Sequence, residues 1–475
     1  MLCPRQTRLE CRVSPLSASY FAFVAVILLA YWLLSGHLRA RLAVLWLANA
    51  FFLARFALYL PLLLLATCSV DYALGAALHR IDSSRTLARR SLLSLSLLMN
   101  LGLLALTRLL PLRIDGNWRW VFPLSLSFYC FQSLSYTIDA YRGERRLAGS
   151  WLSHLAAGTF FVSIVAGPIN RMGDLLGQIE APFHLDRAAC GRAVLLLGSG
   201  MTKKFLLADT LGDTLVNRIF DTPTLYSGAE ALIAAFGYSL QLYYDFSGYT
   251  DMALGIGELF GLHLPENFRR PYAALNLREF WKRWHISFST WIGDYIHNGL
   301  LRWLLCSRQH KAMVYLSLLL TMLLSGLWHG SGWTFLVWGG LHGVGLAFVR
   351  YWYKHWDRHS GEPSLWWRIP SIFFTFCYVT LAWVFFRASD LPNALAVLGR
   401  IVSGSWGIDN ISLPVVKVLV AALFFHLLPE RCFERGAGLL GRTPFYAQAA
   451  VLAGFVLLVQ YLAGSSSAPF VYSHF

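Results

Sequence analysis

A histidine lies near the middle of the longest charge-free run of this chain, in the segment Ser325-Gly-Leu-Trp-His329-Gly-Ser-Gly-Trp333. No Asp, Glu, Lys or Arg occurs from Ala312 to Val349. A histidine at membrane depth is energetically costly, and it usually faces a protein interior or a cavity where it has a task. Because its ordinary pKa is near neutrality, it suits a proton acceptor. We therefore predict that His329 is catalytic, the alternative being a histidine that serves packing alone.

The surroundings of His329 separate it from the other histidine of the run. Gly326, Gly330 and Gly332 interrupt the helical pattern and let backbone or substrate approach closely. His342 lacks this setting, so we expect it to be a packing or hydrogen-bonding residue.

A second group of chemically capable residues lies between residues 243 and 301, where charged and aromatic residues alternate too densely for a helix in lipid. Here Trp281, Trp284, Phe288 and Trp291 recur at the spacing of one helical face. One interpretation is an amphipathic helix at the membrane interface. The other is a basic, aromatic-walled entrance for an anionic donor, with His285 as a second catalytic candidate.

The predicted substrate-binding residues belong mostly to this region. Basic side chains hold phosphates and aromatic faces hold flat bases, whereas an amide suits an oxyanion. The candidates are Asn267, Arg269, Arg270, Lys282, Arg283, Trp284 and Trp328. Asp245 and Asp251 are either buried acids with a function or helix-capping groups.

The elements that must position these residues are membrane helices. Apolar residues make up 56% of the chain and charged residues 14%, against about 25% charged in soluble domains. Long apolar runs without alternation predict an all-α polytopic protein and not a barrel. The expected spans, several of them too short to cross alone, are 20–34, 42–66, 92–110, 121–138, 151–166, 193–207, 229–244, 313–327, 333–349, 369–386, 413–428 and 446–462.

The sequence predicts one membrane-embedded domain over residues 1–475, with N-terminal helices in 17–210, a catalytic core in 229–349 and C-terminal helices in 369–475. The basic residues that give the chain its net charge of +15 lie between the spans. This placement favours contact with anionic membrane lipids over nucleic acid. Eight cysteines without C-x-x-C spacing predict no metal site.

Several motifs in order resemble the membrane-bound O-acyltransferase family, in particular its bacterial alginate O-acetyltransferase type. They run over most of the chain: Leu124-Ser-Leu-Ser-Phe-Tyr-Cys-Phe-Gln132, Ala166-Gly-Pro-Ile-Asn-Arg171, Gly200-Met-Thr-Lys-Lys204, Asp245-Phe-Ser-Gly-Tyr-Thr-Asp-Met252, Phe280-Trp-Lys-Arg-Trp-His-Ile-Ser287, Gly326-Leu-Trp-His-Gly330 and Trp383-Val-Phe-Phe-Arg-Ala388. By this resemblance His329 matches the family's essential histidine, and His285 matches its second polar site residue.

The resemblance implies a bundle of about 11–12 membrane helices with re-entrant segments around a tunnel. It implies an O-acetyltransferase of the bacterial inner membrane that uses acetyl-CoA from the cytoplasm, holds no bound cofactor, and modifies an exported polysaccharide with a periplasmic acetyltransferase partner. Two alternatives stay open. One is D-alanyl transfer from a carrier-protein thioester to a cell-wall polymer, and the other is a transporter or flippase.

Two segments depart from the family's pattern. Asp294-Tyr-Ile-His-Asn-Gly299 replaces a loop that often contains Gly-Gly-Asn, and the chain ends in Phe470-Val-Tyr-Ser-His-Phe475. Both lie where an acceptor or a partner protein would dock, so they leave the acceptor polymer open.

Overall fold

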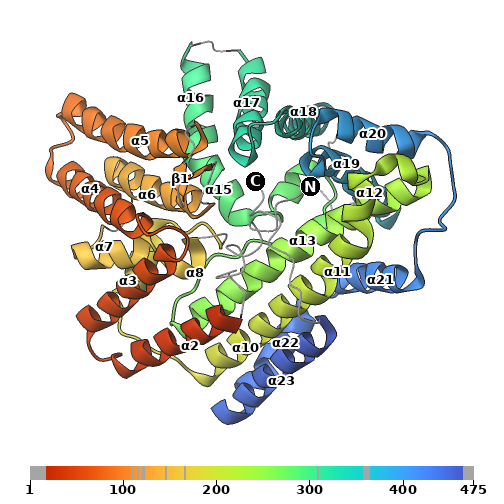
Figure 1. Cartoon of the computed structure of the whole chain (residues 1–475). Coiled ribbons are helices and arrows are strands. Elements are labelled where there is room, and N and C mark those ends of the chain that lie inside the picture. The colour runs from red at the N-terminus through yellow and green to blue at the C-terminus, as the bar shows by residue number, and fades with distance from the viewer. Residues whose placement is uncertain are drawn as a thin grey trace. The chain divides into compact units, whose positions relative to one another are not determined.

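The computed structural model describes residues 18–109, 112–114, 117–119, 124–144, 147–164, 167–307, 310–356 and 364–463 (Figure 1). Most of these residues are helical, as predicted. The strands of the described part form one antiparallel hairpin of β1 (Leu112–Ile114) and β2 (Asn117–Arg119). The C-terminal departure at 470–475 lies outside the described residues.

The chain forms two compact units that alternate along the sequence. Unit 1 comprises residues 1–197, 252–265 and 437–451, and unit 2 comprises 198–251, 266–436 and 452–475. The helices of unit 1 are α2 (Ala18–Leu33), α3 (Leu38–Ala54), α4 (Leu60–Arg80), α5 (Thr86–Leu109), α6 (Leu124–Arg142), α7 (Trp151–Gly158), α8 (Phe161–Ile164) and α9 (Met172–Ile179). Four helices have residues in both units: α10 (Arg187–Met201), α13 (Gly228–Leu259), α22 (Glu430–Gly441) and α23 (Phe445–Ala463).

Unit 2 contains the candidate catalytic residues. Its α-helices are α11 (Asp209–Leu211), α12 (Asn217–Asp221), α14 (Leu277–Trp281), α15 (Ile286–Ile292), α16 (Asn298–Ser307), α17 (Ala312–His329), α18 (Trp333–His355), α19 (Leu365–Arg387), α20 (Leu391–Val402) and α21 (Leu413–Leu427). It also has π-helical segments η1 (Thr202–Ala208), η2 (Gly212–Val216) and η5 (Gly293–His297), and 3₁₀ turns η3 (Pro223–Leu225) and η4 (Pro271–Ala273).

Among the described residues, five helices are long and apolar enough to cross a membrane: Leu60–Arg80, Thr86–Leu106, Ala312–His329, Leu365–Arg387 and Phe445–Leu462. The bent pair of α21 and α22 would make a sixth. Shorter apolar helices at Ser19–Leu33, Trp151–Ile164 and Leu391–Val402 agree with the expectation that several spans are too short to cross alone.

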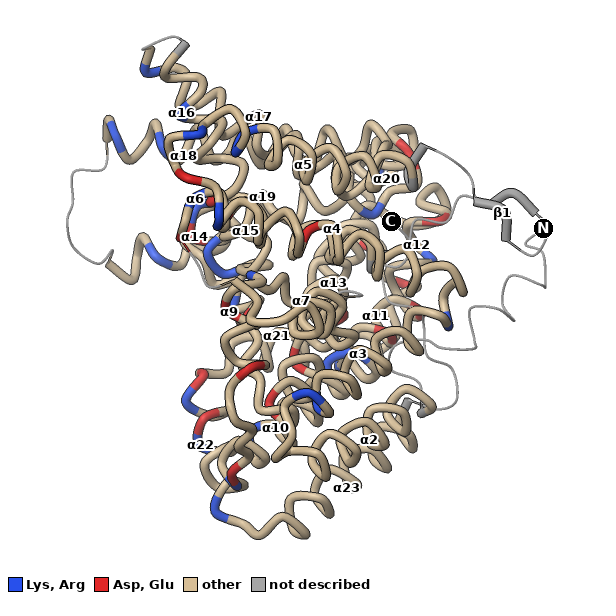
Figure 2. Tube along the Cα trace, turned by 90° about the vertical axis from the view of Figure 1, so that its left-hand side faces the viewer, with Lys and Arg blue, Asp and Glu red and all other residues tan. Residues whose placement is uncertain are grey.

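Figure 2 shows charged residues mostly near helix ends and in connecting segments, with long uncharged stretches along α17, α19 and α23. The chain is therefore a multi-pass membrane protein, and a total of about a dozen spans stays a prediction.

Two predicted segments were wrong in their bounds. The span expected at 42–66 is interrupted between α3 and α4, because Pro61 lies in the first turn of α4 and proline favours a helix start over a helix interior. The helix expected to end at Tyr244 continues as α13 to Leu259, since Asp245 and Asp251 find cationic partners that allow them to stay inside a helix.

A buried carboxylate connects three helices of unit 1 through hydrogen bonds. Asp71 on α4 accepts hydrogen bonds from the Ser96 hydroxyl (2.8 Å) and the Asn100 amide (3.1 Å) on α5, and from Ser133 on α6. Several donors replace the lost hydration of this side chain, which is why it can lie within an apolar helix.

Candidate active site

His329 is held at the end of α17 by a hairpin of two closely packed helices. A Cβ atom on Gly326 would lie 2.3 Å from the Phe335 carbonyl oxygen, and one on Gly339 would lie 2.4 Å from that of Met322. Only glycine permits this approach, as in other membrane helix pairs with small residues at the interface. The predicted break in the helix is confirmed: α17 ends at His329, and α18 begins at Trp333.

Aromatic rings surround the His329 imidazole. Its ring centroid lies 4.5 Å from that of Trp328, 5.0 Å from both Trp338 and Phe386, and 6.0 Å from Phe288. His329 is 6% exposed. Aromatic side chains therefore enclose the imidazole, and its neutral form can accept a proton.

His285 also contacts the ring of Phe288. The His285 and Phe288 rings stack at 5.0 Å, and Phe288 stacks on Trp328 at 4.5 Å. The structure thus brings the two predicted histidines to one aromatic side chain. His285 has a φ of 43°, and among the described non-glycine residues only Arg270 shares this left-handed conformation. Such strain persists where the surroundings enforce it, often at functional sites.

The hydrogen bonds of Asn267 define the protonation of His285. The Asn267 Oδ1 atom accepts from the Ser287 backbone N–H (3.2 Å) and hydroxyl (2.6 Å), and it lies 3.2 Å from His285 Nδ1. Because an amide oxygen only accepts, His285 Nδ1 must donate, which leaves Nε2 as the basic nitrogen. Nε2 is buried and has no hydrogen-bond partner among the described residues. Burial lowers the pKa of His285 to about 3, so it is neutral at physiological pH.

The aromatic stripe of residues 281–291 does not lie on an interfacial helix, so that interpretation was wrong. The helix breaks between α14 and α15, where Phe268 forms an isolated β-bridge with Trp284. Trp284, Phe288 and Trp291 are buried in the protein. Trp284 packs against Phe280 and Trp383 at 5.6 and 5.0 Å, which gives this predicted substrate-binding residue a place in the core.

Most of the predicted phosphate-binding cations already have protein partners. Arg269 pairs with Glu266 (2.5 Å), and Arg283 pairs with Glu279. Arg270 donates to the carbonyl oxygens of His426 (3.3 Å) and Leu427 (2.8 Å), so it caps the C-terminus of α21. Only Lys282 is exposed and has no ion-pair partner among the described residues.

The remaining candidates are satisfied inside the protein. The Trp281 indole N–H donates to His342 Nδ1 at 3.3 Å, which confirms the hydrogen-bonding role expected for His342. Asp251 accepts from Lys203 Nζ (2.6 Å) and Ser199 Oγ (2.9 Å). The described residues contain no group of three or more His, Cys, Asp or Glu side chains that could hold a metal ion.

Asp245 belongs to a buried ion cluster next to two π-helical segments. Lys204 Nζ lies 2.6 Å from Asp245 Oδ1 and 2.7 Å from Asp209 Oδ1. Asp209 Oδ2 has no hydrogen-bond partner among the described residues. Burial raises the pKa of Asp209 to about 6 in spite of the adjacent ammonium group.

This shift predicts a pH dependence of stability. Because the folded-state pKa of Asp209 lies above its ordinary value of 3.8, the folded protein binds this proton more tightly than the unfolded chain. The stability from protonated Asp209 is present at low pH and is lost as the pH rises from about 4 to about 6. Asp209→Asn should flatten this part of a plot of melting temperature against pH. Asp213→Asn, at an exposed position one turn away, should retain it, and an unchanged slope in Asp209→Asn would contradict the assignment.

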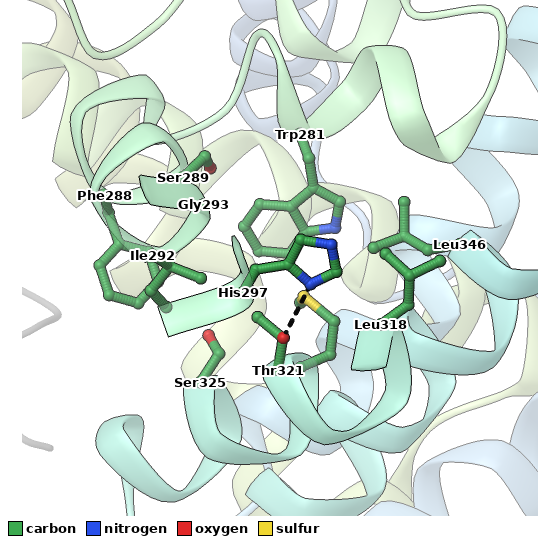
Figure 3. A pocket seen from close by; sticks show the side chains of 11 residues that line it. Trp281, Phe288, Ser289, Ile292, Gly293, His297, Leu318, Thr321, Ser325 and Leu346 are labelled. Atoms are coloured by element: carbon green, nitrogen blue, oxygen red, sulfur yellow. Dashed lines mark hydrogen bonds between the residues drawn. The ribbon is translucent and has the colours of Figure 1, made fainter. Parts of the chain in front are cut away.

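A cavity of about 140 Å³ lies within unit 2 (Figure 3), and Phe288, which contacts the rings of His285 and His329, is one of its lining residues. Phe288 forms part of its wall, together with Trp281, Ile292, Leu318 and Leu346. His297 projects between Trp281 and Thr321, and its Nδ1 atom lies 3.1 Å from the Thr321 hydroxyl. The sequence analysis did not find this cavity, although Ser325, which also lines it, lies one helical turn before His329.

Residues 150–388 match the MBOAT, membrane-bound O-acyltransferase family. The chain is 34% identical to the probable alginate O-acetylase AlgI of Pseudomonas putida over 74% of this chain and 75% of that protein. It is 33% identical to the peptidoglycan O-acetyltransferase of Helicobacter pylori over 83% of this chain and 79% of that protein. It is 32% identical to the teichoic acid D-alanyltransferase of Bacillus subtilis over 49% of this chain and 60% of that protein.

Proposed function

Because this chain belongs to the membrane-bound O-acyltransferase family, we propose that it is an O-acetyltransferase that modifies an exported polysaccharide. The proposed donor is acetyl-CoA, reached from the cytoplasm across the bacterial inner membrane, and a periplasmic acetyltransferase is the proposed partner. The observation that carries the proposal is the pair of buried histidines, His285 and His329, on the shared ring of Phe288. The acetyltransferase names of two relatives that match most of the chain also support it.

In the proposed reaction, His329 acts as the general base. It accepts the proton of the acceptor hydroxyl as the oxygen attacks the thioester carbonyl, and it returns this proton to the departing thiolate. His285 Nε2 carries a lone pair and no proton when Nδ1 donates to Asn267, so it does not donate to an oxyanion. Because the single hydroxyl proton goes to His329, His285 contributes to the shape of the site and not to this proton transfer. Asn267 holds His285 in this tautomer and is therefore a positioning residue.

D-alanyl transfer is the second candidate function, supported by a relative that matches half of the chain. The cavity that Phe288 lines has a largely apolar wall. A D-alanyl group carries an ammonium that would lose its hydration there without a counter-ion, so an uncharged acyl group fits this cavity better. Detection of acetate or of D-alanine as the base-labile ester on cellular polysaccharide separates the two functions.

Lys282 is the remaining candidate for contact with donor phosphates. Lys282→Glu should raise the apparent KM for acetyl-CoA by about tenfold, the cost of one charged contact, with a smaller change in kcat. Initial rates measured at varied acetyl-CoA in membranes give both constants. The matched control is Arg278→Glu, at an exposed position on α14, the short helix that ends just before Lys282; it should leave KM unchanged. An equal effect of both variants would indicate a general attraction to anionic surfaces.

Deletion of the gene tests the proposed function directly. The exopolysaccharide of the deletion strain should lose its base-labile acetate, and the full-length chain should restore it. The transfer of label from acetyl-CoA to polysaccharide by membranes of the two strains tests the donor. An unchanged acetate content after deletion would refute the function, and restored ester without transfer from acetyl-CoA would refute the donor alone.

A further inference from the structure

We propose that a small monovalent metal cation such as Na⁺ binds beside Asp71, near the middle of α4. The helices α4, α5 and α6 pack side by side in unit 1 (Figure 1). The proposed ligands are side-chain oxygens on these three helices, all at most 2% exposed: Asp71, Ser96, Asn100, Ser133 and Thr137. This inference goes beyond the proposed function and does not rest on it, because the candidate catalytic residues belong to unit 2.

The carboxylate of Asp71 lies within an apolar part of the chain. Its helix, Leu60–Arg80, is long and apolar enough to cross a membrane, as is Thr86–Leu106 on α5. Asp71 is 0% exposed and forms no ion pair with another described residue. By contrast, the buried carboxylate of Asp245 in unit 2 pairs with Lys204 Nζ at 2.6 Å. A charge in such surroundings is usually paired or coordinates a metal ion.

The hydrogen-bond donors around Asp71 carry no positive charge. The Ser96 hydroxyl donates to Oδ1 (2.8 Å) and the Asn100 amide to Oδ2 (3.1 Å), and Ser133 also donates to Oδ2. These donors replace the lost hydration, yet the cluster keeps a full negative charge whenever Asp71 is ionised. One monovalent cation would cancel this charge, whereas a divalent cation would leave an excess positive charge in apolar surroundings.

The Asn100 amide is an independent sign of a missing positive group. Its Nδ2 atom lies 3.3 and 3.1 Å from the two carboxylate oxygens, so the side chain points at Asp71. Its Oδ1 atom is buried and has no hydrogen-bond partner among the described residues. A buried acceptor without a partner is costly. A turn of the amide plane, which needs no backbone movement, would bring this oxygen toward a cation at the carboxylate.

The hydroxyl groups of the cluster can also turn their oxygens toward a cation. Because Ser96 has one proton and gives it to Asp71, the Thr137 hydroxyl at 2.9 Å donates to Ser96. A cation would take the place of the Ser96 proton at the carboxylate. Thr137 could then donate to the Leu134 carbonyl at 3.4 Å and leave its lone pairs to the site. Hard cations are bound by such sets of oxygen atoms.

This site differs in kind from the metal sites that the sequence argues against. The cysteine spacing concerns zinc and similar metals. The described residues also contain no group of three or more His, Cys, Asp or Glu side chains that could hold a metal ion. A single carboxylate among neutral oxygens matches a monovalent cation, because the charge of a site is tuned to that of its ion.

The first test measures Na⁺ binding to the full-length chain, purified in detergent with choline chloride as the salt. Equilibrium dialysis against radioactive Na⁺ should show saturable binding. Asp71→Asn keeps the shape of the side chain but removes its charge, and it should lower the bound Na⁺ at least about tenfold. Asp82→Asn removes an exposed carboxylate of the same unit and should bind as the unmodified chain does. No saturable binding, or an equal loss in both variants, would overturn the proposal.

The melting temperature gives a second measurement that does not depend on trapping the ion. NaCl in place of choline chloride, at equal ionic strength, should raise it by about 3–6 °C at about 100 times the apparent Kd. Asp82→Asn should show the same rise and Asp71→Asn none. A proton is the other way to neutralise Asp71. Stabilisation from about pH 8 to about pH 6 that is lost in Asp71→Asn, with no effect of Na⁺, would overturn the metal site.

Asn100→Asp tests whether charge determines the choice of cation. A second carboxylate at the site balances a divalent cation, so CaCl₂ should raise the melting temperature of this variant by at least about 3 °C more than NaCl does. The unmodified chain should respond no more to Ca²⁺ than to Na⁺. If the folded variant shows no preference for Ca²⁺, Asn100 is not a ligand. If the variant does not accumulate, the two measurements on Asp71→Asn decide the proposal.

Discussion

Replacement of His329 with alanine is expected to lower the rate of polysaccharide ester formation by about 10²–10⁴-fold, the usual contribution of a general base. The imidazole is buried among the rings of Trp328, Trp338 and Phe386, and alanine offers no atom to accept the hydroxyl proton. The measurement is the acetate released by base from exopolysaccharide of a deletion strain that expresses the variant. Immunoblotting of the membrane fraction shows whether the variant accumulates.

A second buried histidine provides the control for loss of packing. His342 contacts the same Trp338 ring at 4.9 Å and accepts the Trp281 indole proton. His342→Gln retains a side-chain acceptor and should keep most of the activity, although it disturbs the same aromatic cluster. If both variants lose ester formation equally at normal protein levels, packing and not proton transfer accounts for the effect. Normal ester formation by His329→Ala would show that another group is the base.

The position of His329 could be predicted because the information is local. A long charge-free run, a histidine and three glycines lie within a short stretch of sequence, and the physical cost of a polar group in lipid applies to each position separately. The structure then places His329 at the junction of α17 and α18, next to the glycine contacts. The helical class of the fold was predictable for the same reason, since it follows from backbone hydrogen bonding in an apolar medium.

The arrangement around His285 could not be predicted, because it depends on pairing between distant segments. The periodicity of Trp281, Trp284 and Phe288 is compatible with one helix, yet the chain breaks at His285 because Asn267 bonds to Ser287, 20 residues away. In the same way, Arg270 caps a helix 156 residues later in the chain. No local sequence pattern distinguishes a basic side chain that binds a phosphate from one that caps a helix.

The sequence analysis found neither Ser325 nor the cavity that it lines. Serine at this position lies one turn before His329 and shares its helical face. Its lack of a hydrogen-bond partner among the described residues becomes visible only when the surroundings are known, because serine in a membrane helix ordinarily bonds to its own backbone. The cavity is a property of α14, α15, η5, α17 and α18 together, and its existence follows from packing that the sequence does not encode locally.

Replacement of Lys204 with methionine is expected to destabilise the protein by about 3–5 kcal/mol, the usual effect of removing one partner of a buried ion pair. The Lys204 ammonium is 2% exposed and lies within 2.7 Å of carboxylate oxygens of both Asp209 and Asp245. Methionine fills a similar volume but removes the ammonium group from beside two buried carboxylates. The measurement is the melting temperature of the purified protein in detergent at pH 7.

The neighbouring lysine is a matched control for the loss of Lys204. Lys203 forms a single ion pair with Asp251 at 2.6 Å, and its side chain is 25% exposed, so water can partly replace the lost contact. Lys203→Met should therefore cost less than about half as much. A double variant, Lys204→Met with Asp245→Asn, should recover part of the stability, because one of the two carboxylates that lost the ammonium group is neutralised. If the second substitution brings no recovery, the unpaired charge is not the cause, and the loss reflects the packing of the lysine stem between the π-helical segment η1 and α13.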